Sequence, residues 1–147
     1  MSDDAGLIAL SDGTSGGLVA QSNGKLTIDF TNGGAGGVNP DASYQLGDDT
    51  DPTNKTAFNV SNLDAETHDL TVSYTGVDGG ATGDGTANIQ FNIYDDTGTQ
   101  VGTVSEESTS ATVSSVASGS TLYVVVNVDT TGLTSSTSLS GTLEVSA

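Results

Sequence analysis

Residues 56–76, TAFNVSNLDAETHDLTVSYTG, contain the clearest strand pattern of the chain. Apolar and polar residues alternate twice in this stretch, first in FNVS at 58–61 and then in LTVSYT at 70–75. A period of two places every second side chain on the same face of a strand. The stretch therefore predicts two β-strands, each with one apolar face, and a polar connection at 62–69.

Outward from this stretch, further short segments have strand character. They combine Val, Ile, Leu and Thr and are bounded by Gly, Asn, Asp and Ser, which favour turns. The segment 121–129 is the most continuously apolar, which predicts a central strand. In chain order the segments are 6–10, 18–21, 25–30, 44–46, 88–95, 99–104, 111–116, 121–129 and 138–145.

The strand pattern predicts an all-β protein. No segment shows the sustained 3.6-residue period of an amphipathic helix. About eight to ten short strands, spaced about 8–12 residues apart, are typical of an antiparallel β-sandwich. We predict a single sandwich domain over residues 1–147 that is jelly-roll-like, with an immunoglobulin-like strand order as the alternative.

The chain is strongly acidic, and this excludes several functions. It has 19 Asp and Glu residues against two lysines, for a net charge of −17. Binding to nucleic acid or to anionic membranes needs cationic side chains. The absence of cysteine excludes disulfides, Cys-bound metals and thiol catalysis.

Such a composition fits either a disordered chain or a folded domain adapted to concentrated salt. At about 1 M salt the Debye length falls to about 3 Å, so the repulsion between carboxylates is screened. The alternation of apolar residues favours the folded, halophilic interpretation, because a disordered chain has no reason to alternate.

The sequence predicts no catalytic residue and no enzyme activity. The single histidine, His68, lies at the end of the connection 62–69 and is interpreted as a solvated turn residue. Carboxylate pairs that could serve glycoside hydrolysis arise by chance among 19 acids, and no tryptophan is present for stacking sugars.

Three carboxylates in one predicted loop are candidate calcium ligands. Asp48, Asp49 and Asp51 offer the hard oxygen atoms that calcium prefers. The loop lacks the central glycine and terminal glutamate of an EF-hand, so a solvated acidic loop is the alternative. No other cofactor is expected.

Two N-x-[ST] sequons mark Asn54 and Asn59 as candidate glycosylation sites. In a chain this rich in Ser and Thr, such matches also arise by chance. Asn54 lies in a predicted loop and is the better acceptor. Asn59 is predicted to point away from the core.

The predicted sheet edges are a further candidate for function. Neutral strands rich in Thr and Val can accept an additional strand from another molecule. Glu106 and Glu107 are predicted to blunt one exposed edge, which would favour a monomer.

Two short motifs resemble a known family. Residues 37–42 (GVNPDA) and 58–62 (FNVSN) are similar to the "GxNxxA…FxIxN" signature of secreted haloarchaeal proteins with a DUF1102-type domain of unknown function. Val60 stands where Ile is usual in that signature. The group is similar to archaeal bundling pilins and to the TasA/camelysin family of bacterial matrix-fibre proteins.

The resemblance implies an extracellular structural subunit of a cell-surface fibre, pilus or matrix from a halophile. Assembly would occur by donor-strand complementation with copies of itself or with other surface proteins. The alternative is a monomeric acidic cell-surface module that binds calcium or carbohydrate. The segment available as a donor is short and comprises Ala5, Gly6, Leu7, Ile8, Ala9 and Leu10.

The start of the chain shows no targeting segment. Residues 1–6, MSDDAG, contain no basic region and no apolar run, and no segment of the chain reaches membrane-spanning length. We expect no membrane insertion. The chain is interpreted either as cytosolic or as the mature form of a secreted protein whose signal peptide has been removed.

Overall fold

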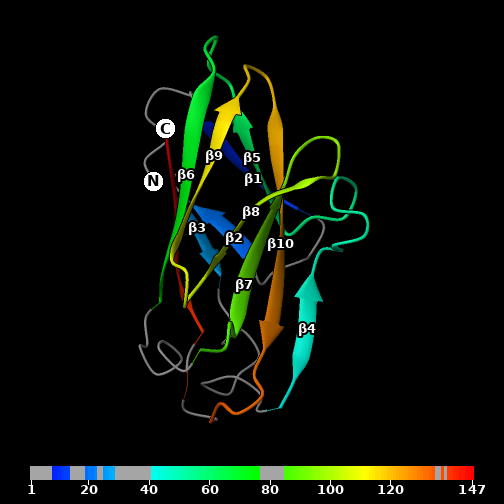
Figure 1. Ribbon diagram of the computed structural model, residues 1–147, viewed down its shortest axis with the longest axis vertical. Helices are drawn as coiled ribbons and strands as arrows, with labels where there is room; N and C mark the ends of the chain where they lie inside the picture. Colours follow the sequence, from blue (N-terminus) through cyan, green and yellow to red (C-terminus); the bar gives the residue numbers. More distant parts are fainter. Residues whose placement is uncertain are drawn as a thin grey trace.

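The computed structural model describes residues 8–13, 19–22, 25–28, 41–76, 85–134, 137 and 139–147. These residues form eleven strands and no helix, arranged as two antiparallel sheets packed against each other (Figure 1). The strands are β1 (Ile8–Asp12), β2 (Val19–Ser22), β3 (Lys25–Ile28), β4 (Ser43–Leu46), β5 (Phe58–Asn62), β6 (His68–Gly76), β7 (Ile89–Tyr94), β8 (Gln100–Ser105), β9 (Ser110–Val116), β10 (Thr121–Asp129) and β11 (Gly141–Ser146).

Sheet A has the order β1-β5-β10-β7-β8, and sheet B has the order β2-β3-β11-β6-β9. The short strand β4 also belongs to sheet A. Val126–Asp129 of β10 pairs with β4, and Thr121–Val124 pairs with β5, while β7 occupies the other side of β10. The strands β4 and β5 therefore lie one after the other along the same side of β10.

Eight of the strands follow the jelly-roll order. The arrangement β5-β10-β7-β8 faces β3-β11-β6-β9, and the chain crosses between the two sheets repeatedly from β5 to β11. The strands β1 and β2 extend the two sheets beyond β5 and β3. The predicted fold class is confirmed, and every segment predicted as a strand contains one. The two strands predicted from residues 56–76 are β5 and β6. They lie in different sheets, so their connection crosses the sandwich.

The core lies between the sheets and is built from the alternating apolar residues. Phe58, Leu70 and Phe91 are fully buried, and the rings of Tyr74 and Phe91 meet across the core with centroids 5.2 Å apart. Burying one such side chain contributes about 1.5–3 kcal/mol. The hydroxyl of Tyr74 donates to the carbonyl of Leu139 at 2.7 Å, and burial raises the pKa of Tyr74 to about 12.

Candidate functional site

The predicted assembly segment lies at an edge of sheet A. Ala5, Gly6 and Leu7 fall outside the described residues, whereas Ile8, Ala9 and Leu10 belong to β1. This strand pairs with β5 over five residues without interruption. Ile8 and Leu10 are 5% and 6% exposed and join the core. The first described strand is thus an edge strand that completes the core.

The end of β1 is fixed by a close approach of two backbones. The N–H of Gly13 donates to the carbonyl of Ala57 at 2.9 Å, which extends the pairing by one residue. A Cβ at position 13 would collide with the carbonyl oxygen of Thr56 and with the backbone of Ala57. Glycine is needed here because only a residue without a side chain fits.

The strand β9, which is an edge strand of sheet B, is irregular. Its register against β6 shifts between His68 and Leu70, and Ser115 has a positive φ of 59°. The N–H of Ser115 donates to Oδ1 of Asp69 at 2.7 Å. Such a bulge bends an edge strand and removes its regular hydrogen-bonding pattern.

The sequence interpretation of Glu106 was wrong. Glu106 is only 5% exposed and folds back onto the start of β7, where it accepts from the N–H groups of Asn88 and Ile89. It satisfies buried backbone donors rather than guarding an edge. Glu107 is exposed, as expected.

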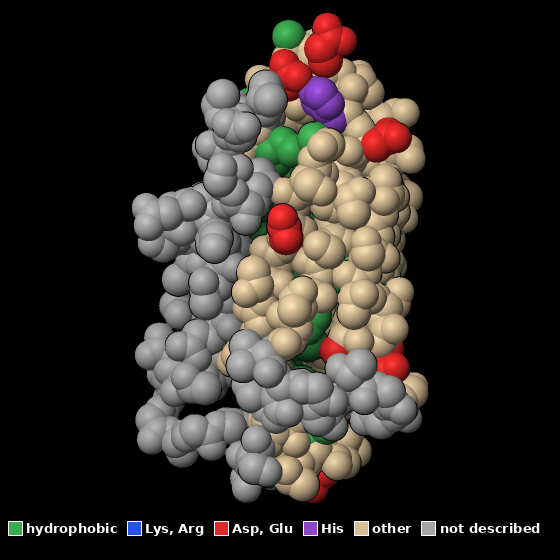
Figure 2. Space-filling model, turned by 90° about the vertical axis from the view of Figure 1, so that its left-hand side faces the viewer, with side chains coloured by type: hydrophobic (Ala, Val, Ile, Leu, Met, Phe, Trp, Pro, Cys, Tyr) green, Lys and Arg blue, Asp and Glu red, His purple; other side chains and the backbone are tan. Residues whose placement is uncertain are grey.

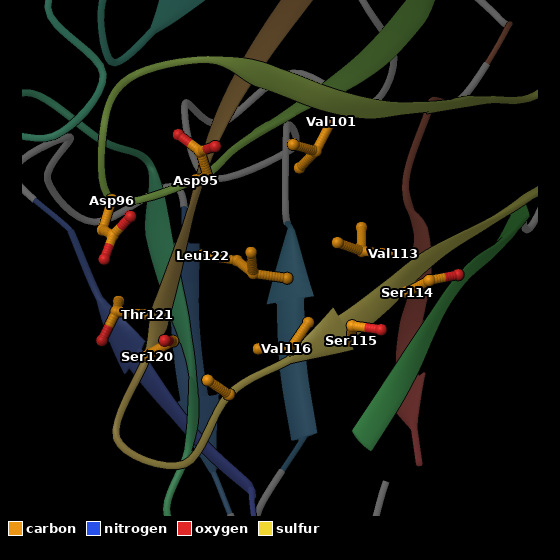
Figure 3. A pocket seen from close by; sticks show the side chains of 11 residues that line it. Asp95, Asp96, Val101, Val113, Ser114, Ser115, Val116, Ser120, Thr121 and Leu122 are labelled. Carbon is orange, nitrogen blue, oxygen red and sulfur yellow. The ribbon is translucent and has the colours of Figure 1, made fainter. Parts of the chain in front are cut away.

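A small pocket of about 230 Å³ opens beside β9. Figure 3 shows Asp95 and Asp96 on one side of it and Val113 of β9 on the other, with Leu122 between them. Val113 and Leu122 belong to the core, and both aspartates are at least partly exposed. The pocket is an opening over the core and has no buried charged group.

The acidic loop between β4 and β5 covers part of the outer face of sheet A. Asp49 joins this loop to the sheet through four hydrogen bonds. It accepts from Tyr94 Oη at 2.5 Å, Asn92 Nδ2 at 3.2 Å, Gln45 Nε2 at 2.9 Å and Asn127 Nδ2 at 2.7 Å. Asn92 and Tyr94 point away from the core yet are 7% and 6% exposed. The Asp49 carboxylate is therefore the anchor of the loop.

The other two predicted calcium ligands bind different partners. Asp48 accepts from the hydroxyl and N–H of Thr50 at 2.6 and 2.9 Å and from Lys55 Nζ at 3.1 Å. The hydroxyl of Thr50, together with these other donors, lowers the pKa of Asp48 to about 2. Asp51 accepts from Asn54 Nδ2 at 2.8 Å. Within the described residues, no group of three or more His, Cys, Asp or Glu could hold a metal ion, and calcium binding stays a prediction.

The two candidate glycosylation sites differ in their surroundings. Asn54 is exposed, but Thr56 of its sequon is 4% exposed and its hydroxyl donates to the carbonyls of Phe58 and Val124. Asn59 is half-buried on the outer face of β5, between Ser11 and Tyr123. Glycosylation at either position stays a prediction.

His68 is hydrogen-bonded to Asp64 at the start of β6. Its Nε2 lies 2.5 Å from Oδ2 of Asp64, and this contact lowers the pKa of Asp64. The pair joins the β5–β6 turn to β6. The turn itself is held by Asn62, which is fully buried and donates from Nδ2 to the carbonyls of Glu66 and Val116. Asn62, the second asparagine of the FNVSN motif, thus has a structural role.

The described acidic residues lie mainly in turns, and the strands of sheet B are nearly neutral. In β6, β9 and β11 only Asp69 and Glu144 are acidic. Figure 2 shows the molecule from the side of sheet B, with few acidic side chains in the centre and more toward the two ends. The outer face is lined by Ser and Thr, and the hydroxyls of Thr71 and Thr112 lie 3.0 Å apart.

Comparison with known proteins gave no match to a family, to a curated protein or to a solved structure. Within the described part of the chain there is also no helix with the length and apolar composition needed to cross a membrane.

Proposed function

We propose that this protein is a structural subunit of a cell-surface fibre, pilus or matrix, and that it assembles by exchanging β1 between neighbouring copies. The observation that carries the proposal is the position of β1. The strand lies at a sheet edge near the start of the described chain, pairs regularly with β5 and contributes Ile8 and Leu10 to the core.

Exchange of β1 preserves the contacts that hold it in the monomer. An identical strand from a second copy can form the same five register pairs with β5 and place the same two apolar side chains in the core. The net change in contacts is then small, so the protein concentration decides how far exchange proceeds. The resemblance to the DUF1102-type domain and its fibre-forming relatives supports the same mechanism.

The chain has no cysteine, so a disulfide between two introduced cysteines gives a direct test of strand exchange. Ala9 and Ser61 are register partners on the outer side of β1 and β5. We would purify Ala9→Cys and Ser61→Cys as separate proteins, mix them at high concentration in molar NaCl and oxidise the mixture. Strand exchange places the two cysteines of different copies opposite each other, so a disulfide-linked heterodimer is expected on a non-reducing gel.

A matched control uses a pair inside sheet B. Thr75 and Thr142 are register partners on β6 and β11, which are not expected to exchange. A mixture of Thr75→Cys and Thr142→Cys should give no more heterodimer than unrelated surface cysteines. Equal crosslinking in the two mixtures, or none with Ala9→Cys and Ser61→Cys, would contradict the proposal and favour the monomeric binding module.

The halophilic part of the proposal has its own test. Added salt screens the repulsion among carboxylates that produces the net charge of −17. The melting temperature is therefore expected to rise as NaCl increases from about 0.1 M to molar concentrations. A constant melting temperature over this range would show that the acidic composition is not an adaptation to salt.

A further inference from the structure

An open groove of about 640 Å³ crosses the outer face of sheet A. Its lining comes from β4, from the start of β7, from the end of β10 and from the acidic loop. Asp49 of the acidic loop lines the groove, and Ser43 and Asp129, which also line it, are register partners. The groove therefore lies where the anchored loop meets the sheet.

Three carboxamides form a row across the floor of this groove. Gln45 of β4 is the register partner of Asn127 of β10, and Asn127 is the register partner of Gln90 of β7. Neighbouring strands are about 4.8 Å apart, so the row extends about 10 Å perpendicular to the strands. A row of this length can follow an extended polymer along more than one of its units.

The network around Asp49 fixes two of the three carboxamides. Gln45 Nε2 donates to Asp49 at 2.9 Å and to Oδ1 of Asn127 at 2.6 Å, and Asn127 Nδ2 donates to Asp49 at 2.7 Å. Toward a ligand, Gln45 therefore offers its carbonyl oxygen as an acceptor, and Asn127 offers its second N–H as a donor. Groups that are already held in place lose little conformational entropy when a ligand binds. Gln90 is half-buried and can both donate and accept a hydrogen bond.

The chemistry of the lining selects the kind of ligand. Its charged members are the carboxylates of Asp49 and Asp129, and neither lysine of the chain lines the groove. Phosphates, acidic polysaccharides and nucleic acids are disfavoured because the protein is itself strongly anionic. Carboxylates and carboxamides instead match the hydroxyl groups of sugars, which both donate and accept hydrogen bonds.

We propose that this groove binds an uncharged polysaccharide, which lies across β4, β10 and β7 and is hydrogen-bonded by Gln45, Asn127 and Gln90. This site does not depend on strand exchange. In a fibre it would attach each subunit to a neutral matrix glycan, and in a monomer it would act alone.

The test measures binding of soluble polysaccharides by isothermal titration calorimetry in molar NaCl. The probes are dextran, mannan and a soluble β-glucan, with alginate as the acidic counterpart. The protein carries both Ala9→Cys and Ser61→Cys and is oxidised while dilute, so that β1 is locked within its own chain and strand exchange cannot influence the result. At least one neutral polysaccharide is expected to bind, and alginate is not.

The key variant is Gln90→Ala, because the Gln90 side chain is outside the network that anchors the loop. It is expected to weaken binding at least tenfold while the melting temperature stays unchanged. The matched control is Thr142→Ala on the outer face of sheet B, which should bind as the unsubstituted protein does. No binding of any neutral probe, stronger binding of alginate, or equal affinities for Gln90→Ala and the unsubstituted protein would each overturn the proposal.

Discussion

The edge strands β1 and β9 bury similar side chains but differ in their backbones. Ile8 and Leu10 of β1 are 5% and 6% exposed, and Val113 and Val116 of β9 are 7% and 5% exposed. The strand β1 makes five consecutive register pairs, whereas the pairing of β9 is interrupted by a register shift. Burial alone therefore does not distinguish the two edge strands.

The regular backbone of β1 suits the proposed exchange better than the interrupted backbone of β9. A regular edge offers an incoming strand a continuous series of donors and acceptors. At β9 the positive φ of Ser115 turns the backbone, and the N–H of that residue donates to the side chain of Asp69 on the neighbouring strand β6. The proposed strand exchange uses the regular edge at β1, and substitutions at β1 and β9 test whether the difference in backbone regularity matters.

The largest expected effect is the loss of an apolar side chain from β1. Leu10→Ala removes a buried side chain that joins the core, and such substitutions cost about 3 kcal/mol of unfolding free energy. Among the described strands, β1 pairs only with β5. Hydrogen exchange at Ile8–Asp12 should therefore accelerate more than the decrease in the unfolding free energy of the whole protein explains. Urea unfolding and native-state exchange measure the two effects.

Val113→Ala is the matched substitution on β9. It should lower the unfolding free energy of the whole protein as well. Hydrogen exchange at β1 should not increase selectively, and the crosslinking between Ala9→Cys and Ser61→Cys should not change. If Leu10→Ala and Val113→Ala changed this crosslinking equally, the distinction between the two edges would fail.

The second prediction concerns the residue that ends β1. Gly13→Ala places a Cβ against the backbone carbonyl of Thr56, which cannot move without disturbing the start of β5. Overpacking of this kind costs about 2 kcal/mol. Circular dichroism melting should show the loss. Gly102→Ala is the control for introducing a methyl group alone, because its φ is not in the positive range and the nearest atom to the added Cβ, Cδ1 of Ile93, lies at 3.4 Å.

The sequence predicted the strands well because alternation is a local property. The period of two requires the inward side chains of β5 and β6 to be buried. This holds for Phe58 and Val60 and for Leu70, Val72 and Tyr74. The pattern could not show that β5 and β6 belong to different sheets. Partner choice depends on contacts between distant residues, and a short connection fits either arrangement.

The role of individual polar residues was not predictable in the same way. Asp49 is one of 19 acidic residues, and nothing local distinguishes it from Asp48 or Asp51. Its function as an anchor follows from the positions of Asn92 and Asn127, which are distant in sequence. The same holds for Glu106, whose partners at the start of β7 precede it by 18 and 17 residues.

The third prediction tests the irregular edge. Asp69→Ala removes the acceptor for the N–H of Ser115, and an exposed hydrogen bond to a carboxylate contributes about 1 kcal/mol. Hydrogen exchange at Ser115 should accelerate while exchange in β1 stays unchanged. Glu144→Ala, which removes an exposed carboxylate from β11 of the same sheet, is the control. Unchanged exchange at Ser115 in Asp69→Ala would show that this aspartate does not hold the irregular backbone of β9.

The smallest effect is expected at acidic pH, in the β7–β8 turn beside the irregular edge. Asp95 accepts from the hydroxyl of Thr97 at 2.6 Å and from the N–H groups of Thr97 and Thr99 at 2.9 Å, and these bonds lower its pKa. A carboxyl group whose pKa is lower in the folded state stabilises the protein above its unfolded pKa of about 4, and this contribution disappears as the pH falls through the folded value. Urea midpoints measured between pH 5 and pH 2 should therefore fall more for the unsubstituted protein than for Asp95→Asn, whose side chain does not titrate. Equal slopes for the two proteins would mean that the turn does not contribute to the pH dependence of stability.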